Sequence, residues 1–265
     1  MTGSHAARDS ATMLRRNLRH LQRYPGLSLF PILMPVVFLL LFAYVFGATL
    51  GDGIVPGGGR DAYIDFLAPG VLLFAVAGAA QIVAISVAKD MTEGIIGRFK
   101  TMRIWRPAVL AGHVLGTLLL AVASIAVAIA VALLIGWDPS AGPLDWVAAC
   151  GLLVLVSLAL IWLSVALGLV AKSVETASNL PMVLILLPFV SSAFVPTDSM
   201  PAGLGWFAEH QPFTPITDTL RALLDGGSAG ASGPAAVAWC LAIAAAGYAW
   251  SRYLYDRRPA VASGA

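Results

Sequence analysis

The chain has 265 residues, of which 59% are hydrophobic and only 11% charged, and its formal net charge is +2. Soluble domains carry roughly 25% charged residues, so this composition excludes an ordinary water-soluble fold. A bilayer span needs about 20 apolar residues, and the sequence contains several such runs, which indicates an all-α protein that crosses a membrane several times. The two cysteines, Cys150 and Cys240, lie inside apolar runs. We therefore expect them in the core rather than in disulfides or a zinc site.

The first predicted element is a basic amphipathic helix over residues 10–24. On a helical wheel of about 100° per residue, its leucines and Met13 share one face. The basic side chains share the other face, and they are Arg15, Arg16, Arg19 and Arg23. Such a helix is typical of segments that lie in the headgroup plane, although a plain positive flank of a span would carry the same charges. Residues 1–25 are therefore expected to be a cytoplasmic tail with this helix, without a removable signal peptide.

Six apolar runs follow, each long enough or nearly long enough to cross a bilayer. They are residues 27–50, 66–88, 109–136, 144–171, 177–195 and 234–253. Glycine- and proline-rich connectors separate them, which predicts one membrane domain over residues 26–255 and a tail over residues 256–265.

The distribution of basic residues predicts the orientation of the chain. Six spans place both termini on one side, and every Lys and Arg except Arg60 and Arg221 then shares that side. The positive-inside rule therefore predicts that both termini face the cytoplasm. The membrane orientation explains why the basic residues cluster, so their clustering does not indicate nucleic-acid binding.

The predicted cytoplasmic loop after the second span carries an apolar stripe. The stripe residues fall within about 80° on a helical wheel, and they are Met91, Ile95, Phe99 and Met102. Charged side chains accompany them, and these are Glu93, Arg98, Lys100 and Arg103. The stripe can pack on the bilayer, on the protein's own spans or in the groove of a partner. Periodicity alone favours the first two of these interpretations.

The segment before the last predicted span is unusually apolar for a loop. Prolines interrupt it repeatedly, which predicts short broken helices on the outer side, either at the interface or dipping into the membrane where protein covers the backbone. An aromatic interfacial belt is about equally consistent with the composition. The residues that mark this outer segment are Pro196, Pro201, Trp206, Pro212 and Phe213.

The chemistry that the sequence lacks also narrows the function. The middles of the predicted spans contain no ionisable side chain, which argues against an ion-coupled transporter. Gln81 and Asn179 are costly to bury and favour a cavity or an interhelix bond. The chain has no GxxxxGK[ST] phosphate loop and no histidine pair spaced for a metal, so we expect no catalytic residues, no bound cofactor or metal, and no ATP hydrolysis by this chain alone.

Three ordered stretches resemble the type-2 ABC exporter permeases, in particular the daunorubicin/doxorubicin-resistance branch. They lie at residues 66–70, 93–104 and 194–223. The resemblance implies a permease in the plasma (inner) membrane of a bacterium that pairs with a second permease, either a copy or a paralogue. It also implies two copies of a separate cytoplasmic ABC ATPase, which bind the ATP and Mg. In such exporters the N-terminal helix and the first cytoplasmic loop contact the ATPases, and the outer segment closes the exit.

The resemblance also implies that the first, second and fifth spans face the dimer axis and the substrate path. This places five residues among the candidates for that path, namely Phe38, Phe42, Phe46, Gln81 and Asn179. The expected function is export of a hydrophobic or amphipathic drug, secondary metabolite or lipid. The alternatives are a membrane scaffold or assembly protein without transport and, less favoured, an ion-coupled secondary transporter.

Overall fold

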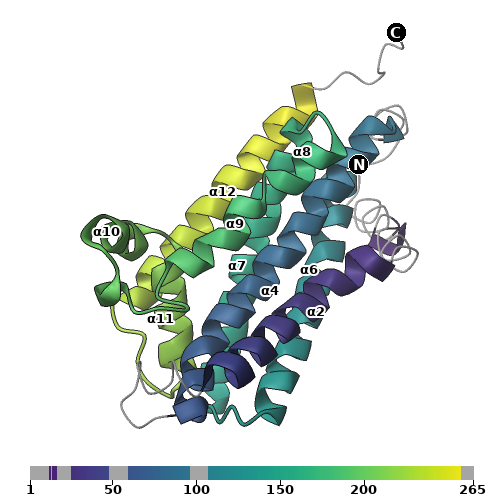
Figure 1. Ribbon diagram of the computed structural model, residues 1–265. Coiled ribbons are helices and arrows are strands. Elements are labelled where there is room, and N and C mark those ends of the chain that lie inside the picture. Colours follow the sequence, from purple (N-terminus) through teal and green to yellow (C-terminus); the bar gives the residue numbers. More distant parts are fainter. Residues whose placement is uncertain (1–11, 13, 17–24, 48–58, 96–106, 258–265) are drawn as a thin grey trace.

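The computed structural model describes residues 12, 14–16, 25–47, 59–95 and 107–257, and its regular structure over these residues is helical throughout (Figure 1). Within them, five helices are long and apolar enough to cross a membrane. They are α2 (Pro25–Leu41) continued by the π-helix η1 (Phe42–Phe46), α4 (Gly59–Thr92), α6 (Pro107–Leu134), α7 (Pro143–Val170) and α12 (Ser232–Arg257). The prediction of an all-α protein with several membrane spans is confirmed, whereas the number six is not.

Helix α4 is the centre of the bundle. It contacts α2, α6 and α7 along its length, and most of its side chains are buried. Glycines allow the closest helix pairs: a Cβ on Gly168 of α7 would lie 2.6 Å from the carbonyl oxygen of Ala84, and one on Gly247 of α12 would lie 2.6 Å from the backbone nitrogen of Leu163. Small residues at such crossings let backbones pack directly against each other.

The predicted span 177–195 is not one continuous helix. The structure divides its apolar run into α8 (Val174–Asn179), α9 (Met182–Leu186) and the 3₁₀ helix η2 (Leu187–Val190). Pro181 and Pro188 lie at the two joints, and each lacks the N–H that would continue the helical ladder. The stretch Val174–Val190 is therefore a shorter, broken apolar rod.

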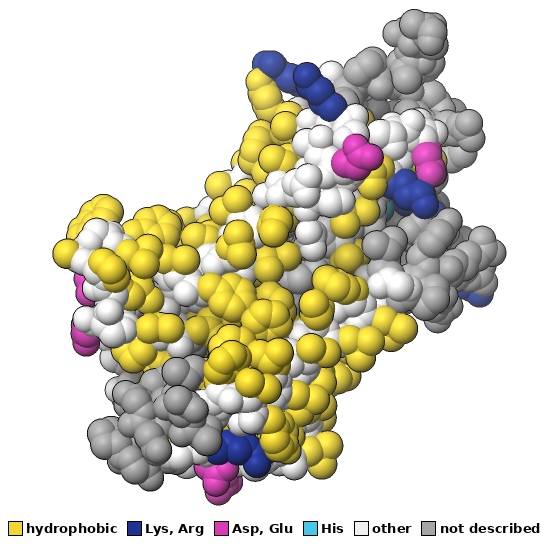
Figure 2. Space-filling model, viewed as in Figure 1, with side chains coloured by type: hydrophobic (Ala, Val, Ile, Leu, Met, Phe, Trp, Pro, Cys, Tyr) yellow, Lys and Arg dark blue, Asp and Glu magenta, His cyan; other side chains and the backbone are white. Residues whose placement is uncertain are grey.

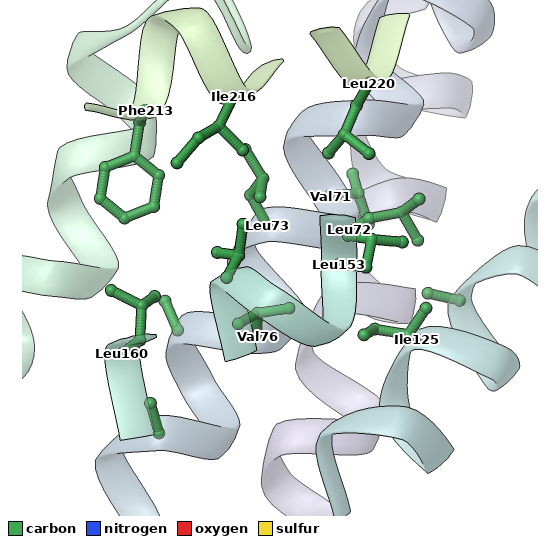
Figure 3. Close-up of a cluster of buried hydrophobic side chains, with 14 of the residues drawn as sticks. Val71, Leu72, Leu73, Val76, Ile125, Leu153, Leu160, Phe213, Ile216 and Leu220 are labelled. Atoms are coloured by element: carbon green, nitrogen blue, oxygen red, sulfur yellow. The ribbon is translucent and has the colours of Figure 1, made fainter. Parts of the chain in front are cut away.

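The short helices predicted before the last span are present. A 3₁₀ turn, η3 (Thr197–Ser199), leads to α10 (Ala202–His210) and α11 (Phe213–Leu224). Helix α11 packs against α12, α7 and α4, and Figure 3 shows Phe213, Ile216 and Leu220 pointing into a core shared with α4 and α7. Helix α10 lies at the edge of the bundle (Figure 1).

The helices begin and finish at the two ends of the bundle. Figure 1 shows that α2 begins toward the same end at which α4 and α12 finish, whereas α4, α7 and α12 begin at the opposite end. We call these the terminal end and the opposite end.

The prediction that both cysteines lie in the core is half right, because Cys240 is buried but Cys150 is exposed on α7.

Candidate translocation site and its polar anchors

Six phenylalanine rings from three parts of the chain meet beside α4, and we call them the phenylalanine cluster. Helix α2 and η1 supply Phe38, Phe42 and Phe46, α4 supplies Phe74, and the region of η2 supplies Phe189 and Phe194. Neighbouring ring centroids are between 4.5 Å (Phe189–Phe194, stacked) and 6.0 Å (Phe42–Phe194) apart. These separations are typical of favourable aromatic pairs, so the rings form one connected surface.

The cluster is open on one side. Phe194 is 6% exposed, Phe46 is 40% exposed, and the other four rings are half-buried. Hydrophobic side chains cover most of the face that carries α2, α4 and α9, with charged side chains toward its ends and at the α10 edge (Figure 2). An apolar patch of this kind marks a surface that another molecule covers, whether protein, lipid or ligand.

The structure brings together only part of the predicted substrate path. Phe38, Phe42 and Phe46 lie in the cluster, as part of one ring network. The sequence analysis missed Phe74, Phe189 and Phe194, although all three lie in predicted spans that the family resemblance already assigned to the path. Aromatic content in those spans is the signal that would have found them.

Gln81 and Asn179 lie at the break between α8 and α9 instead of among the rings. The Gln81 side chain donates a hydrogen bond from Nε2 to the carbonyl oxygen of Ser178 at 2.7 Å. Asn179 ends α8 with an exposed side chain. Carbonyl groups at a helix end lack intrahelical donors, and Gln81 supplies one from α4.

A second polar anchor surrounds Arg221 on α11, and we call Arg221, Asp218, Ser192 and Phe66 the Arg221 clamp. The Arg221 Nη2 donates to the carbonyl oxygens of Ser192 at 2.9 Å and Phe66 at 3.2 Å. Its guanidinium lies 4.4 Å from the centroid of the Phe66 ring and forms an ion pair with Asp218 at 3.3 Å. The Ser192 hydroxyl donates to Asp218 at 2.6 Å. The clamp therefore joins α4, α11 and the turn after η2.

Burial lowers the pKa of Arg221 below its ordinary value, and Asp218 and Asp225 oppose this shift. Arginine remains protonated in proteins in spite of such shifts. The clamp therefore contains a largely buried cation, and its hydrogen bonds and ion pair must offset the free-energy cost of burying that charge.

The five residues that mark the outer segment do not form one group. Pro201 and Pro212 precede α10 and α11, and Pro196 precedes η3. Trp206 is 63% exposed on α10 and stacks on the His210 ring at 4.7 Å, whereas Phe213 is buried in the core.

At the terminal end, the side chains of Arg16 and His113 meet at Asp90. Its carboxylate forms an ion pair with Arg16, and its Oδ2 lies 3.0 Å from Nε2 of His113. The Asp90 side chain is only 13% exposed. Arg16 of the predicted interfacial helix is thus joined to Asp90 of α4, which also contacts His113 of α6. Arg15 is exposed, and Arg19 and Arg23 lie outside the described residues.

The structure describes only the start of the predicted cytoplasmic loop after the second span, which the family resemblance assigns to ATPase contact. Met91 lies in the last turn of α4, Glu93 is exposed in the following turn, and Ile95 is partly buried. Gly94 has a φ of +68°, a left-handed conformation that commonly ends helices. The continuous helix that the helical wheel assumed for the apolar stripe is therefore interrupted at Gly94. The remaining loop residues lie outside the described part of the chain, and they are Arg98, Phe99, Lys100, Met102 and Arg103.

Comparisons with known proteins identify the family. Residues 9–224 match the family described as ABC-2 type transporter. The chain is 32% identical over 230 residues to the daunorubicin resistance ABC transporter permease protein DrrB1 of Streptomyces coeruleorubidus, an alignment that covers 84% of this chain and 79% of that one. It is 30% identical over 174 residues to ABC transporter G family member 20 of Dictyostelium discoideum, covering 64% of this chain and 23% of that longer protein. The chain therefore belongs to the ABC-2 type transporter family, as a multi-pass membrane permease that works with an ABC ATPase.

Proposed function

We propose that this permease exports an aromatic or amphipathic drug-like compound and that the phenylalanine cluster forms a wall of its path. The observation that carries the proposal is the open, connected ring surface between α2, α4 and η2. Aromatic rings bind planar apolar molecules by stacking and edge contacts. The Streptomyces relative is named for resistance to daunorubicin, an amphipathic compound that joins a planar aromatic ring system to an amino sugar and is a suitable probe.

The chemistry of the cluster favours an apolar cargo over an ionic one. None of its six members carries a charge or a hydrogen-bonding group. A charged solute crossing beside it would lose its hydration without compensation. An amphipathic compound can place its rings against the phenylalanines while its polar end stays hydrated.

The complex that we propose contains two permeases and two ATPase subunits in the plasma (inner) membrane of a bacterium, with both ends of this chain in the cytoplasm. The half-exposed cluster supports a second permease, because a partner across the path would cover the open side of the rings. ATP and Mg belong to the ATPase in this scheme, since the sequence of this chain contains no phosphate-binding loop. No residue of this chain is assigned a catalytic role.

Transport in reconstituted vesicles tests the proposal. The permease and its ATPase are incorporated into liposomes, and daunorubicin uptake is followed with and without ATP. We expect uptake that needs both subunits. We also expect Phe189→Ala to raise the half-saturating drug concentration, whereas Phe207→Ala, which removes an exposed ring from α10, should not. Absence of ATP-dependent movement for daunorubicin and other amphipathic aromatic compounds would contradict the proposal and favour a scaffold.

A further inference from the structure

The broken rod between α8 and the turn after η2 is attached to α4 by polar bonds at both ends. Gln81 of α4 binds the carbonyl oxygen of Ser178 near the end of α8. Arg221 joins the carbonyl oxygen of Phe66 on α4 to that of Ser192 in the turn that follows the rod. Between these anchors the rod carries Phe189 and has several exposed apolar side chains, which are Met182, Val183 and Leu186.

The anchor at Ser192 lies next to the rings. Ser192 is three residues after Phe189 and two before Phe194, and these two rings stack at 4.5 Å. The turn also packs directly on α4, because a Cβ on Gly70 would lie 2.9 Å from the carbonyl oxygen of Ala193 and 3.2 Å from the Phe194 ring. A small movement of this turn would therefore shift both rings relative to those of α2.

We infer that Arg221 is a positioning residue for the substrate path: by binding Ser192 and Phe66 it holds the Phe189–Phe194 stack against the rings of α2 and α4. This inference rests on the proposed function of the cluster. Arg221 acts at a distance from the substrate, since the aromatic ring that its guanidinium covers is Phe66, outside the cluster. Asp218 supports it by binding both the guanidinium and the Ser192 hydroxyl.

The Arg221 geometry requires the guanidinium. Its planar fork donates to two carbonyl oxygens while pairing with a carboxylate and covering a ring. A lysine presents a single ammonium group on a flexible stem and cannot reproduce this arrangement. Arg221→Lys should therefore restore only part of what Arg221→Gln loses.

Two matched pairs of variants separate positioning from general stability. Arg60→Gln is the control for Arg221→Gln, because Arg60 also covers a ring (Tyr44, at 4.1 Å) and donates to a carbonyl oxygen (Ile135, at 3.0 Å). Ser251→Ala is the control for Ser192→Ala. The Ser251 hydroxyl likewise joins two segments, donating from α12 to the carbonyl oxygen of Trp162 on α7 at 3.1 Å.

The first readout is the position of the turn and needs no drug. Ala193 is fully buried behind the clamp, so Ala193→Cys in a Cys150→Ser background should react slowly with a maleimide. Adding Arg221→Gln should accelerate the reaction, whereas adding Arg60→Gln should not. Unchanged labelling in a folded Arg221→Gln protein would overturn the inference.

The second readout is daunorubicin binding to the purified permease, followed by the drug's fluorescence. We expect Arg221→Gln to raise the Kd by about tenfold, as when a buried charge-assisted network is broken, and Ser192→Ala to raise it less. Ser251→Ala should bind like the wild type. Normal binding in Arg221→Gln, or equal weakening in Ser192→Ala and Ser251→Ala, would overturn the positioning role. If Arg221→Gln does not fold, Ser192→Ala decides in both readouts. A wild type that binds no aromatic drug would refute the proposed function, while the labelling would still report on the clamp.

Discussion

Replacing Gly168 by alanine should push α4 and α7 apart. The added Cβ would lie 2.6 Å from the carbonyl oxygen and 2.9 Å from the Cα of Ala84. Both are backbone atoms of the central helix, so relief requires a shift of α4 or α7 and not a rotamer change. Overpacking of this kind costs about 1–3 kcal/mol, whereas alanine in place of glycine gains up to about 1 kcal/mol in a helix. The expected net loss in the free energy of unfolding is about 1–2 kcal/mol.

Gly151 provides the control within the same helix. No atom lies within 4 Å of a Cβ built at Gly151, so Gly151→Ala should gain helix propensity without a clash and stabilise the protein by about 0.5–1 kcal/mol. Unfolding of both variants in mixed micelles with increasing SDS measures the two effects. Opposite signs support the described packing of α4 on α7. A Gly168→Ala protein at least as stable as the wild type would refute it.

Two further predictions concern the terminal end and the orientation of the chain. Asp90→Asn should lower the free energy of unfolding by about 1–3 kcal/mol, because it removes the carboxylate that pairs with Arg16. Arg15→Gln should change it little. Equal melting temperatures for the two variants would contradict the role of Asp90. In a Cys150→Ser background, Ser228→Cys should react with an impermeant maleimide on intact cells and Lys172→Cys only after permeabilisation, and the reverse pattern would refute the predicted orientation.

The sequence predicts the long helices well because their apolar content alone specifies them. It does not reveal the break in the rod Val174–Val190, since proline also lies within intact helices, as Pro31 and Pro35 do in α2. What differs is the tertiary surroundings: Gln81 from another helix supplies a donor at the break. Bonds between residues far apart in the chain leave no periodic pattern in the sequence.

The candidate site, too, is predicted from the sequence only in part. The rings of Phe38, Phe42 and Phe46 follow a four-residue spacing along one helix and could be proposed from the sequence. Their partners come from α4 and from a turn more than one hundred residues later in the chain. The contact between Asp90 and His113 joins two helices across the loop that separates them. Only the folded structure shows these groups together.

The most direct test of the central claim, that the phenylalanine cluster lines the drug path, is photocrosslinking from within it. Benzoylphenylalanine replaces Phe189 in one protein and Trp239, an exposed residue of α12, in the other. Each protein is irradiated with labelled daunorubicin in the reconstituted complex. We predict a crosslink at Phe189 that excess unlabelled drug suppresses, and at Trp239 only a background that excess drug leaves unchanged. A competed crosslink at Trp239 with none at Phe189 would contradict the account.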